Sequence, residues 1–520
     1  MARRPRQSGI GVPLFSLVSS ASWGIGEFTD LPAFASWCQA AGQRYVQLLP
    51  LNEISPGETS PYSSMTAMAL DPIYIHLPAV EDVAALGGEA ELPGTDRALL
   101  ARLRQSPRVL YAEVRQLKLR LLRRAYQRFA AEELQRHTAR AASFGQYVAA
   151  QSWWLDAYAT FRAIHAAHEE RAWWQWPAPL AAGDPDALRE TSEALADERS
   201  FRAWLQWLAE GQWQAARVAA GVRVLGDLPF MISGDSPDVW ARRDQFMLDA
   251  TVGVPPDAFS DTGQDWGLPP WRWEVMQRTG FHWMRARARR TAALFDGVRI
   301  DHLVGLYRIY VRTMDPAVEN RFAPDDDATQ SQLGARILGI YLQSGMEIVA
   351  EDLGTVPAFV RHSMARLGIP GFKVMRWERE WEEDGQPFVD PSDYPEVSVA
   401  LSGTHDTESL AQWWRDLPGI DRASFLTLPS LKALTGRSPF VPVVRDALVG
   451  ALLGSASATV MLPLQDVFGW DVRINTPGTV NDSNWTWRTA VPVDRWRDAS
   501  DWVERAAWLR RHVEASARHL

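Results

Sequence analysis

The sequence predicts an α/β fold in which eight parallel strands close into a (β/α)8 TIM barrel with large, mainly helical inserted subdomains and an active-site loop insertion. Eight short runs of β-branched and large apolar residues occur along the chain, with helical sequence between them. This alternation is typical of parallel βαβ units, and eight units favour a closed barrel over an open sheet. The runs are Val12–Leu17, Tyr45–Leu49, Val222–Leu225, Val298–Ile300, Ile348–Ala350, Gly371–Met375, Val397–Leu401 and Thr459–Leu462.

Two insertions interrupt this alternation within one catalytic barrel that spans 1–520. Segment 99–221 is rich in Ala, Arg, Glu, Leu and Trp, which predicts a helical subdomain inserted after the second strand. Segment 230–295, between the third and fourth strands, is rich in Pro, Gly, Asp and Trp and suits an ordered loop with some helix over the barrel mouth. The apolar stripe of the first insertion, spaced as on one helix face, is Leu110, Val114, Leu117 and Leu121.

Composition excludes several classes of function. The 520 residues carry a net charge of −9, which leaves no basic field for nucleic acid and disfavours anionic substrates. None of the lysines Lys118, Lys373 and Lys432 follows a glycine, so the P-loop motif is absent. The single cysteine, Cys38, excludes an internal disulfide and fits a cytoplasmic protein. No run reaches the roughly 18 to 20 apolar residues of a membrane-spanning helix.

Acidic residues follow four of the eight predicted strands. They are Asp227 in VLGDLP, Asp301 in VRIDH, Glu351 in IVAEDLG and Asp406 in GTHD. Any one of them alone suits a helix cap or a solvated turn. Because the carboxyl ends of all strands in a parallel barrel meet at one face, we expect the four acids to converge on a single cleft.

Paired carboxylates in a cleft are the groups that glycosidic bond cleavage requires. Arg299 and Asp301 are two residues apart on one strand, so their side chains share a face, and the guanidinium favours the ionised form of Asp301. Glu351, near that negative charge and partly desolvated, should hold its proton to higher pH. Asp406 with His405 is suited to binding sugar hydroxyls and to stabilising an oxocarbenium-like transition state.

The 25 tryptophans against 11 tyrosines agree with a sugar substrate, since indole rings pack well on the apolar faces of sugars. We expect most of them to lie in the core. Trp266, in the Gly/Pro-rich loop, is the better candidate for contact with substrate. The tryptophans of the helical insertion expected in the core include Trp153, Trp154, Trp173 and Trp174.

Other chemistries find little support. His165 and His168 lie at helical spacing but without the HExxH order, so we expect a solvated helix face and not a metal site. No serine stands in a GxSxG motif, and neither Gly-Ile-Gly completes GxGxxG.

Blocks of sequence along nearly the whole chain resemble the 4-α-glucanotransferases (amylomaltases or disproportionating enzymes), which are glycoside hydrolase family 77 of the α-amylase clan. In chain order they are PLFSLVSSASWGIGEFTDL, SPYSSMTAMALDPIYI, GDLPFMISGDSPDVWA, GVPPDAFSDTGQDWGLPPWRW, RIDH, AEDLG, GTHD and INTPGTVNDSNWTWR. The resemblance implies a (β/α)8 barrel, α-1,4-glucan substrates, a retaining double-displacement mechanism, and neither a metal nor an organic cofactor.

The resemblance also implies roles for matched residues. Asp301 would be the nucleophile, Glu351 the general acid and then base, and Asp406 the stabiliser of the transition state. Trp266 lies in the block that resembles the active-site cover, and Tyr62 in a block near the glucan groove. The substrate-binding residues that follow are Arg299, His405, Asp227, Trp266, Tyr62 and His302.

Two departures from the family pattern stand beside the acids. Many members read DHFRG and GTHDNDT where this chain has DHLVG from Asp301 and GTHDTES from Gly403. The acids are intact, so we expect the chemistry to persist, while acceptor preference and chain-length choice stay open. The alternatives are an α-1,4-glucan hydrolase with the same acids and an inactive glucan-binding protein.

Overall fold

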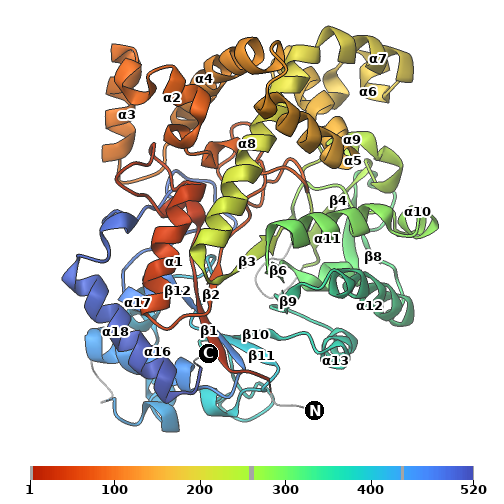
Figure 1. The fold of residues 1–520 in the computed structure, drawn as a ribbon. Helices are drawn as coiled ribbons and strands as arrows, with labels where there is room; N and C mark the ends of the chain where they lie inside the picture. Colours follow the sequence, from red (N-terminus) through yellow and green to blue (C-terminus); the bar gives the residue numbers. More distant parts are fainter. Residues whose placement is uncertain (1–3, 257–262, 435–438, 519–520) are drawn as a thin grey trace.

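Eight parallel strands close into a barrel in the order β1-β12-β11-β10-β9-β6-β3-β2, which confirms the predicted (β/α)8 fold (Figure 1). The computed structural model describes residues 4–256, 263–434 and 439–518. Strands such as β6 and β11 are buried along their whole length, as expected when helices cover the outside of the sheet. The barrel strands are β1 (Gln7–Gly11), β2 (Tyr45–Gln47), β3 (Arg223–Leu228), β6 (Gly297–Ile300), β9 (Glu347–Ala350), β10 (Gly371–Val374), β11 (Ser398–Leu401) and β12 (Thr459–Pro463).

The α-helices between and around these strands differ widely in length. They are α1 (Leu31–Ala40), α2 (Glu81–Ala85), α3 (Gly94–Gln105), α4 (Tyr111–Phe129), α5 (Ala139–Ala167), α6 (Ala178–Ala182), α7 (Pro185–Ala194), α8 (Ala196–Ala220), α9 (Pro237–Ala241), α10 (Trp273–Arg278), α11 (His282–Leu294), α12 (Asp327–Gln343), α13 (Ala358–Leu367), α14 (Leu410–Asp416), α15 (Gly419–Phe425), α16 (Pro442–Gly454), α17 (Leu464–Phe468) and α18 (Ser500–Ala515). None of those in the described part of the chain is long and apolar enough to cross a membrane.

The first barrel strand lies upstream of its predicted place. The prediction of a strand over Val12–Leu17 is wrong, because β1 ends at Gly11 and a short 3-10 helix, Leu14–Ser16, follows. Pro13 precedes that helix and lacks the N–H that a ladder needs. Within β1, a Cβ on Gly9 would lie 2.6 Å from Cβ of Tyr45, so only glycine lets the two strands approach. The other seven predicted runs overlap barrel strands.

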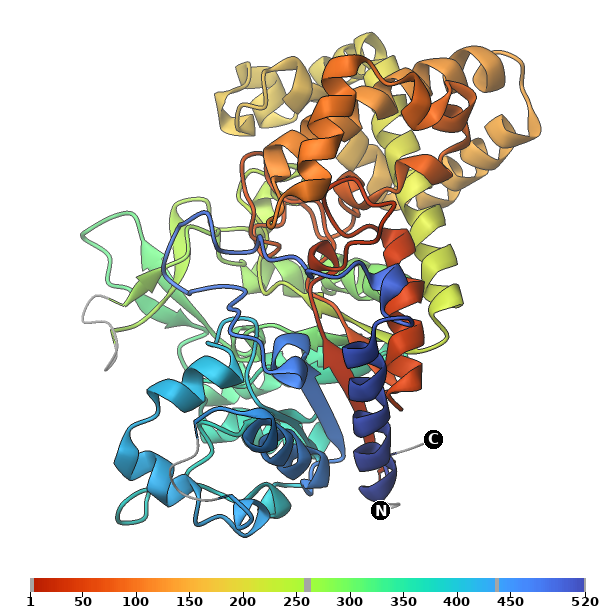
Figure 2. The same ribbon diagram turned by 90° about the vertical axis from the view of Figure 1, so that its left-hand side faces the viewer.

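Helices α2 to α8 connect β2 to β3 and gather at one end of the molecule, beyond the barrel (Figures 1 and 2). Val114, Leu117 and Leu121 lie on the buried face of α4. The 25-residue helix α8 runs from this helical region down to the barrel, where it packs beside α1. The segment predicted as a helical insertion, 99–221, is therefore held to the barrel by a helix that belongs to both.

A second, antiparallel sheet of order β5-β4-β7-β8 lies beside the barrel, and the sequence pattern did not predict it. Its strands are β4 (Ala250–Val254), β5 (Gln264–Asp265), β7 (Ile309–Thr313) and β8 (Arg321–Ala323). The strands are short, and the partners are distant in sequence: Val252 pairs with Val311. The segment 230–295 thus contributes strands β4 and β5 and helices α9 to α11, and residues 257–262 of its loop lie outside the described residues.

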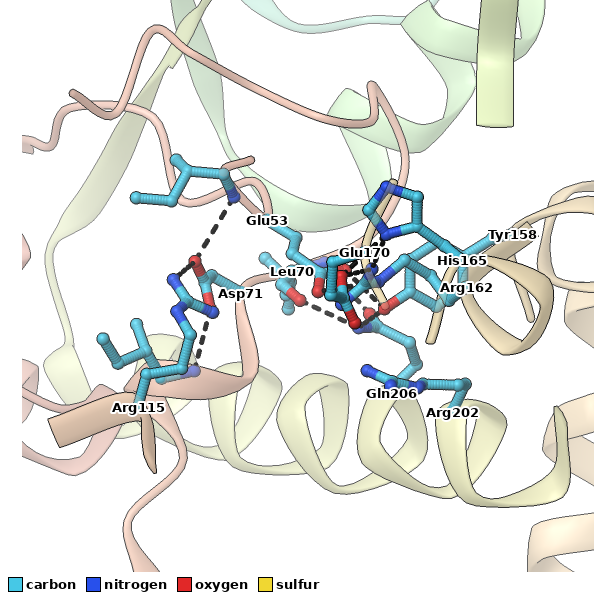
Figure 3. Close-up of polar contacts among 12 residues, drawn as sticks. Glu53, Leu70, Asp71, Arg115, Tyr158, Arg162, His165, Glu170, Arg202 and Gln206 are labelled. Carbon is cyan, nitrogen blue, oxygen red and sulfur yellow. Dashed lines mark hydrogen bonds and ion pairs between the residues drawn. The ribbon is translucent and has the colours of Figure 1, made fainter. Parts of the chain in front are cut away.

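A buried ionic network joins α5 to the loops that leave the barrel (Figure 3). The expectation of a solvated helix face at His165 is wrong, because its side chain is fully buried. Its Nδ1 lies 2.7 Å from Glu170 and its Nε2 lies 3.0 Å from Asp235. Arg162 donates to Glu170 at 2.8 Å and pairs with Glu53, from the loop after β2, at 3.2 Å. Paired charges can be buried in this way because each partner compensates for the hydration that the other loses on burial.

The tryptophans of the helical region divide between core and surface. Trp154 and Trp173 are buried, as expected, and Trp153 is partly buried against the core. The expectation is wrong for Trp174, which is 57% exposed.

Candidate active site

The four acids singled out in the sequence lie at the carboxyl-terminal end of the barrel. Asp227 is the penultimate residue of β3, Asp301 directly follows β6, and Glu351 directly follows β9. These three strands are consecutive neighbours in the barrel. Ile300 pairs with Ala350, so the backbones of the next residues, Asp301 and Glu351, run side by side at the spacing of neighbouring strands, roughly 5 Å.

Arg299 links two of these acids. Its Nη1 donates to both carboxylate oxygens of Asp227, at 2.8 and 2.7 Å, and its Nη2 lies 2.9 Å from Oδ1 of Asp301. The side chains of Arg299 and Asp227 are 5% and 0% exposed. Burial raises the pKa of Asp227 and Arg299 opposes that rise. The guanidinium therefore holds Asp301 in place and lowers the electrostatic cost of its charge.

Glu351 has the environment of a proton donor. One carboxylate oxygen accepts a hydrogen bond from the backbone N–H of His302 at 2.7 Å, and the other accepts from the N–H of Leu353 at 3.0 Å. Burial raises the pKa of Glu351 to about 7; Arg299 opposes this rise and the charge of Asp301 adds to it. Near neutral pH, Glu351 can therefore hold and release a proton.

Asp406 lies on the loop after β11 and has its own set of partners. Nδ2 of Asn475 donates to Oδ1 at 2.6 Å, and Nε2 of His405 lies 3.3 Å from Oδ2. Although its partly enclosed position opposes ionisation, His405 and Asn475 hold the pKa of Asp406 below its ordinary range. Gly403 allows the loop to turn here, since a Cβ at this position would lie 2.4 Å from Oγ1 of Thr407.

Tyr62 connects the groups around Asp227 and Asp406. Its hydroxyl donates to Oδ2 of Asp227 at 2.8 Å and accepts from Arg299 at 3.1 Å. Its ring stacks on His405 with centroids 5.0 Å apart and lies 5.8 Å from the ring of Trp485. The aromatic cluster thereby fixes the orientation of His405 beside Asp406.

Trp266 packs beside His302, the residue that follows Asp301. Its ring meets those of His302 and Phe230 edge to face, with centroids 5.0 and 6.1 Å apart. His302 adopts a left-handed backbone conformation (φ 43°), and burial lowers its pKa to about 4, so the imidazole is neutral near pH 7. The structure therefore brings all nine residues singled out by the sequence to the same end of the barrel.

Sequence reasoning missed three residues that complete this arrangement. Asn475 hydrogen-bonds Asp406, Trp485 packs on Tyr62, and Phe230 packs on Trp266. The first two lie in the block INTPGTVNDSNWTWR, but neither follows a strand of the barrel, so their position along the chain gave no signal. Among the described residues, no group of three or more His, Cys, Asp or Glu side chains is placed to hold a metal ion.

A cavity of about 50 Å³ opens at this end of the barrel and is lined in part by Arg299 and His405. Gln47 and Gln465 line the same cavity from β2 and α17. The basic and amide side chains of this cavity can form hydrogen bonds with a polyhydroxylated ligand.

Comparison with known proteins agrees with this chemistry. Residues 12–492 match the family model of glycoside hydrolase family 77, described as 4-alpha-glucanotransferase. The chain is 34% identical to the 4-alpha-glucanotransferase of Chlamydia pneumoniae over 504 residues, with 94% of this chain and 92% of the relative covered. It is 33% identical to that of Thermus thermophilus over 472 residues, covering 88% and 89%.

The fold is shared with solved structures. An amylomaltase from Streptococcus agalactiae in complex with acarbose superposes with a TM-score of 0.82 at 25% identity, covering 99% of this chain and 100% of that one. An amylomaltase from Corynebacterium glutamicum superposes with a TM-score of 0.77 at 23% identity, covering 97% and 75%. With two neighbouring carboxyl groups at the barrel mouth and these matches along its length, the chain belongs to glycoside hydrolase family 77, the 4-α-glucanotransferases.

Proposed function

We propose that this 4-α-glucanotransferase moves α-1,4-glucan segments from a maltodextrin donor to a glucose or glucan acceptor by double displacement, with Asp301 as nucleophile. The observation that carries the assignment is the contrast between two neighbouring acids. Asp301 lies 2.9 Å from Nη2 of Arg299, whereas burial raises the pKa of Glu351 to about 7. An ionised and a protonated carboxyl group side by side are what a retaining mechanism needs.

In the first half-reaction, Glu351 gives its proton to the glycosidic oxygen while Asp301 attacks the anomeric carbon. The bond from C1 to the leaving oxygen breaks, the bond from C1 to Asp301 forms, and the shortened glucan leaves with the proton. Asp406, whose low pKa keeps it ionised, stabilises the positive charge that develops on the sugar ring. Asp227, Arg299 and His405 bind the hydroxyls of the same glucosyl residue.

In the second half-reaction, the ionised Glu351 takes a proton from the acceptor hydroxyl, which attacks C1 and releases Asp301. A sugar hydroxyl and water compete at this step. Trp266, which packs on His302 beside the nucleophile, favours the sugar by covering the site and offering an aromatic face. We infer that Tyr62 performs the matching role on the side of Asp227.

Incubation with maltotriose tests transfer against hydrolysis. A transferase yields glucose together with maltotetraose and longer oligosaccharides, with little net gain in reducing ends. A rise in reducing ends at every turnover without longer products would identify a hydrolase. Maltodextrin binding without any product would identify a binding protein. Either of these results would overturn the proposal.

A further inference from the structure

A second cavity, of about 790 Å³, lies at the opposite end of the barrel from the catalytic acids. It is lined by residues just before β2, β3 and β6 and by the last turns of α18. Helices α1 (red), α8 (yellow-green) and α18 (dark blue) run side by side toward this end in Figure 2.

This cavity is distinct from the active site. Arg223, which lines it, is the first residue of β3, whereas Asp227 lies four residues further along the same strand. At the rise of a β-strand, four residues span roughly 13 Å. The barrel interior between them is filled by apolar side chains, including Leu225 and Val349, so a ligand in this cavity cannot reach the catalytic carboxylates.

Arginine dominates the charge around the cavity although the whole chain carries a net charge of −9. Five arginines line it, against two acids, Asp296 and Glu514. An adjoining cavity of about 300 Å³ shares Arg44 and Arg223. The five are Arg44, Arg217, Arg223, Arg510 and Arg518.

Several polar groups here have no partner in the described part of the chain. The guanidinium groups of Arg44 and Arg217 make no ion pair or hydrogen bond with the described residues, and Nε of Arg44 is buried. Oε1 of Gln43, a residue only 4% exposed, is also buried without a hydrogen-bond partner. The unpaired guanidinium groups of Arg44 and Arg217 on the cavity wall can therefore bind a negatively charged ligand.

Arg518 adds a buried positive charge that no carboxylate balances among the described residues. Its guanidinium donates to backbone carbonyls, including those of Leu453, Ser457 and Ala458. Burial, together with the charge of Arg6, lowers the pKa of Arg518. An anion in the cavity would offset that penalty, because a nearby negative charge favours the protonated guanidinium.

We propose that this cavity binds a phosphorylated sugar. Guanidinium groups bind phosphate oxygens in pairs, and Arg44 and Arg217 are available for this. The volume, about 790 Å³, accommodates more than a phosphate ion. Gln43, Asp296 and Glu514 suit hydroxyl groups, and no aromatic side chain lines the cavity to stack a nucleotide base.

Isothermal titration calorimetry of the full chain with glucose 1-phosphate tests the proposal. We expect saturable binding, with glucose and inorganic phosphate each at least tenfold weaker. Arg44→Ala and Arg217→Ala should each raise Kd at least about tenfold, as expected when a charge-assisted hydrogen bond is lost. Arg189→Ala, which removes an exposed arginine on α7, is the matched control and should leave Kd unchanged.

Each other result would overturn the proposal. The site would be ruled out if the wild-type chain did not bind glucose 1-phosphate. It would also be ruled out if Arg44→Ala and Arg217→Ala both bound glucose 1-phosphate with the Kd of the wild-type chain. If inorganic phosphate bound as tightly as glucose 1-phosphate, or if ADP bound more tightly than glucose 1-phosphate, the ligand would not be a phosphorylated sugar. Because Arg44 and Arg217 lie at the far end of the barrel, both variants should retain maltotriose transfer. That activity shows that they fold and separates this test from that of the catalytic mechanism.

Discussion

The backbone N–H of His302 donates a hydrogen bond of 2.7 Å to Oε2 of Glu351. His302 follows Asp301 directly, so the segment that carries Asp301, the proposed nucleophile, also holds Glu351, the proposed proton donor, in position. The left-handed conformation of His302 (φ 43°) turns its N–H toward the neighbouring strand end. A left-handed backbone at a residue other than glycine is strained, and strain of this kind is typical of functional sites.

Replacing the nucleophile should separate binding from turnover. Asp301→Asn keeps the shape of the side chain but removes its negative charge, so transfer should fall by at least about a thousandfold while maltodextrin affinity is largely kept. Product formation from maltotriose and calorimetric binding measure the two effects. Asp186→Asn, an exposed acid on α7, is the control. Near-normal turnover of Asp301→Asn would remove Asp301 from the mechanism.

The pKa of Glu351 predicts the alkaline limb of the pH profile. Burial raises this pKa to about 7, and the acid must be protonated to start the reaction, so kcat/KM should fall as pH rises through about 7. Glu351→Gln should lose activity on maltotriose but release fluoride from α-maltosyl fluoride, whose leaving group needs no proton. If Glu351→Gln releases no fluoride from α-maltosyl fluoride, Glu351 is not the proton donor.

Breaking the buried pair of Arg299 and Asp227 should reduce stability as well as activity. Arg299→Met leaves Asp227 buried without its cation, which should lower the free energy of unfolding by about 3 to 5 kcal/mol. The double variant Arg299→Met with Asp227→Asn should regain part of that stability and none of the activity. Urea unfolding and the maltotriose assay measure both quantities. A double variant no more stable than the single one would contradict this account.

If Trp266 covers the proposed nucleophile, its removal should admit water to the site. Trp266→Ala deletes the ring that packs on His302, and we expect the ratio of hydrolysis to transfer to rise several-fold, with a smaller effect on total turnover. Reducing-end release per maltotriose consumed reports this ratio. Trp174→Ala, at an exposed position of the helical region, should leave it unchanged. An unchanged ratio in Trp266→Ala would show that this side chain does not exclude water.

The buried His165 should make stability depend on pH. Burial opposes its charge, but hydrogen bonds to Asp235 and Glu170 raise its pKa above the unfolded value. The extra stability is therefore complete below the unfolded pKa, about 6.5, and is lost as pH rises through the folded value. Compared with His165→Gln, the wild-type chain should lose more unfolding free energy between pH 6 and pH 9. If the free energy of unfolding fell by the same amount in the wild-type chain and in His165→Gln, this account would be wrong.

Local sequence patterns predicted the barrel and the acids around its mouth. A short run of β-branched and large apolar residues indicates a buried strand. A residue directly after a parallel strand can lie only at the carboxyl-terminal end of a barrel. Asp301 and Glu351 were found in this way. The same reasoning misplaced the first strand, because the buried helix around Leu14 and Phe15 is as apolar as a strand.

The tertiary structure decided what depends on residues far apart in the chain. Asn475 meets Asp406 across 69 positions, and His165 meets Asp235 across 70. Whether such a side chain is buried and paired depends on which segments pack against it. The spacing of apolar residues in the nearby sequence does not reveal those segments. The arginine-lined cavity is the clearest case: the sequence determined an acidic chain, and only folding gathered its scattered cations, from Arg44 to Arg518, around one space.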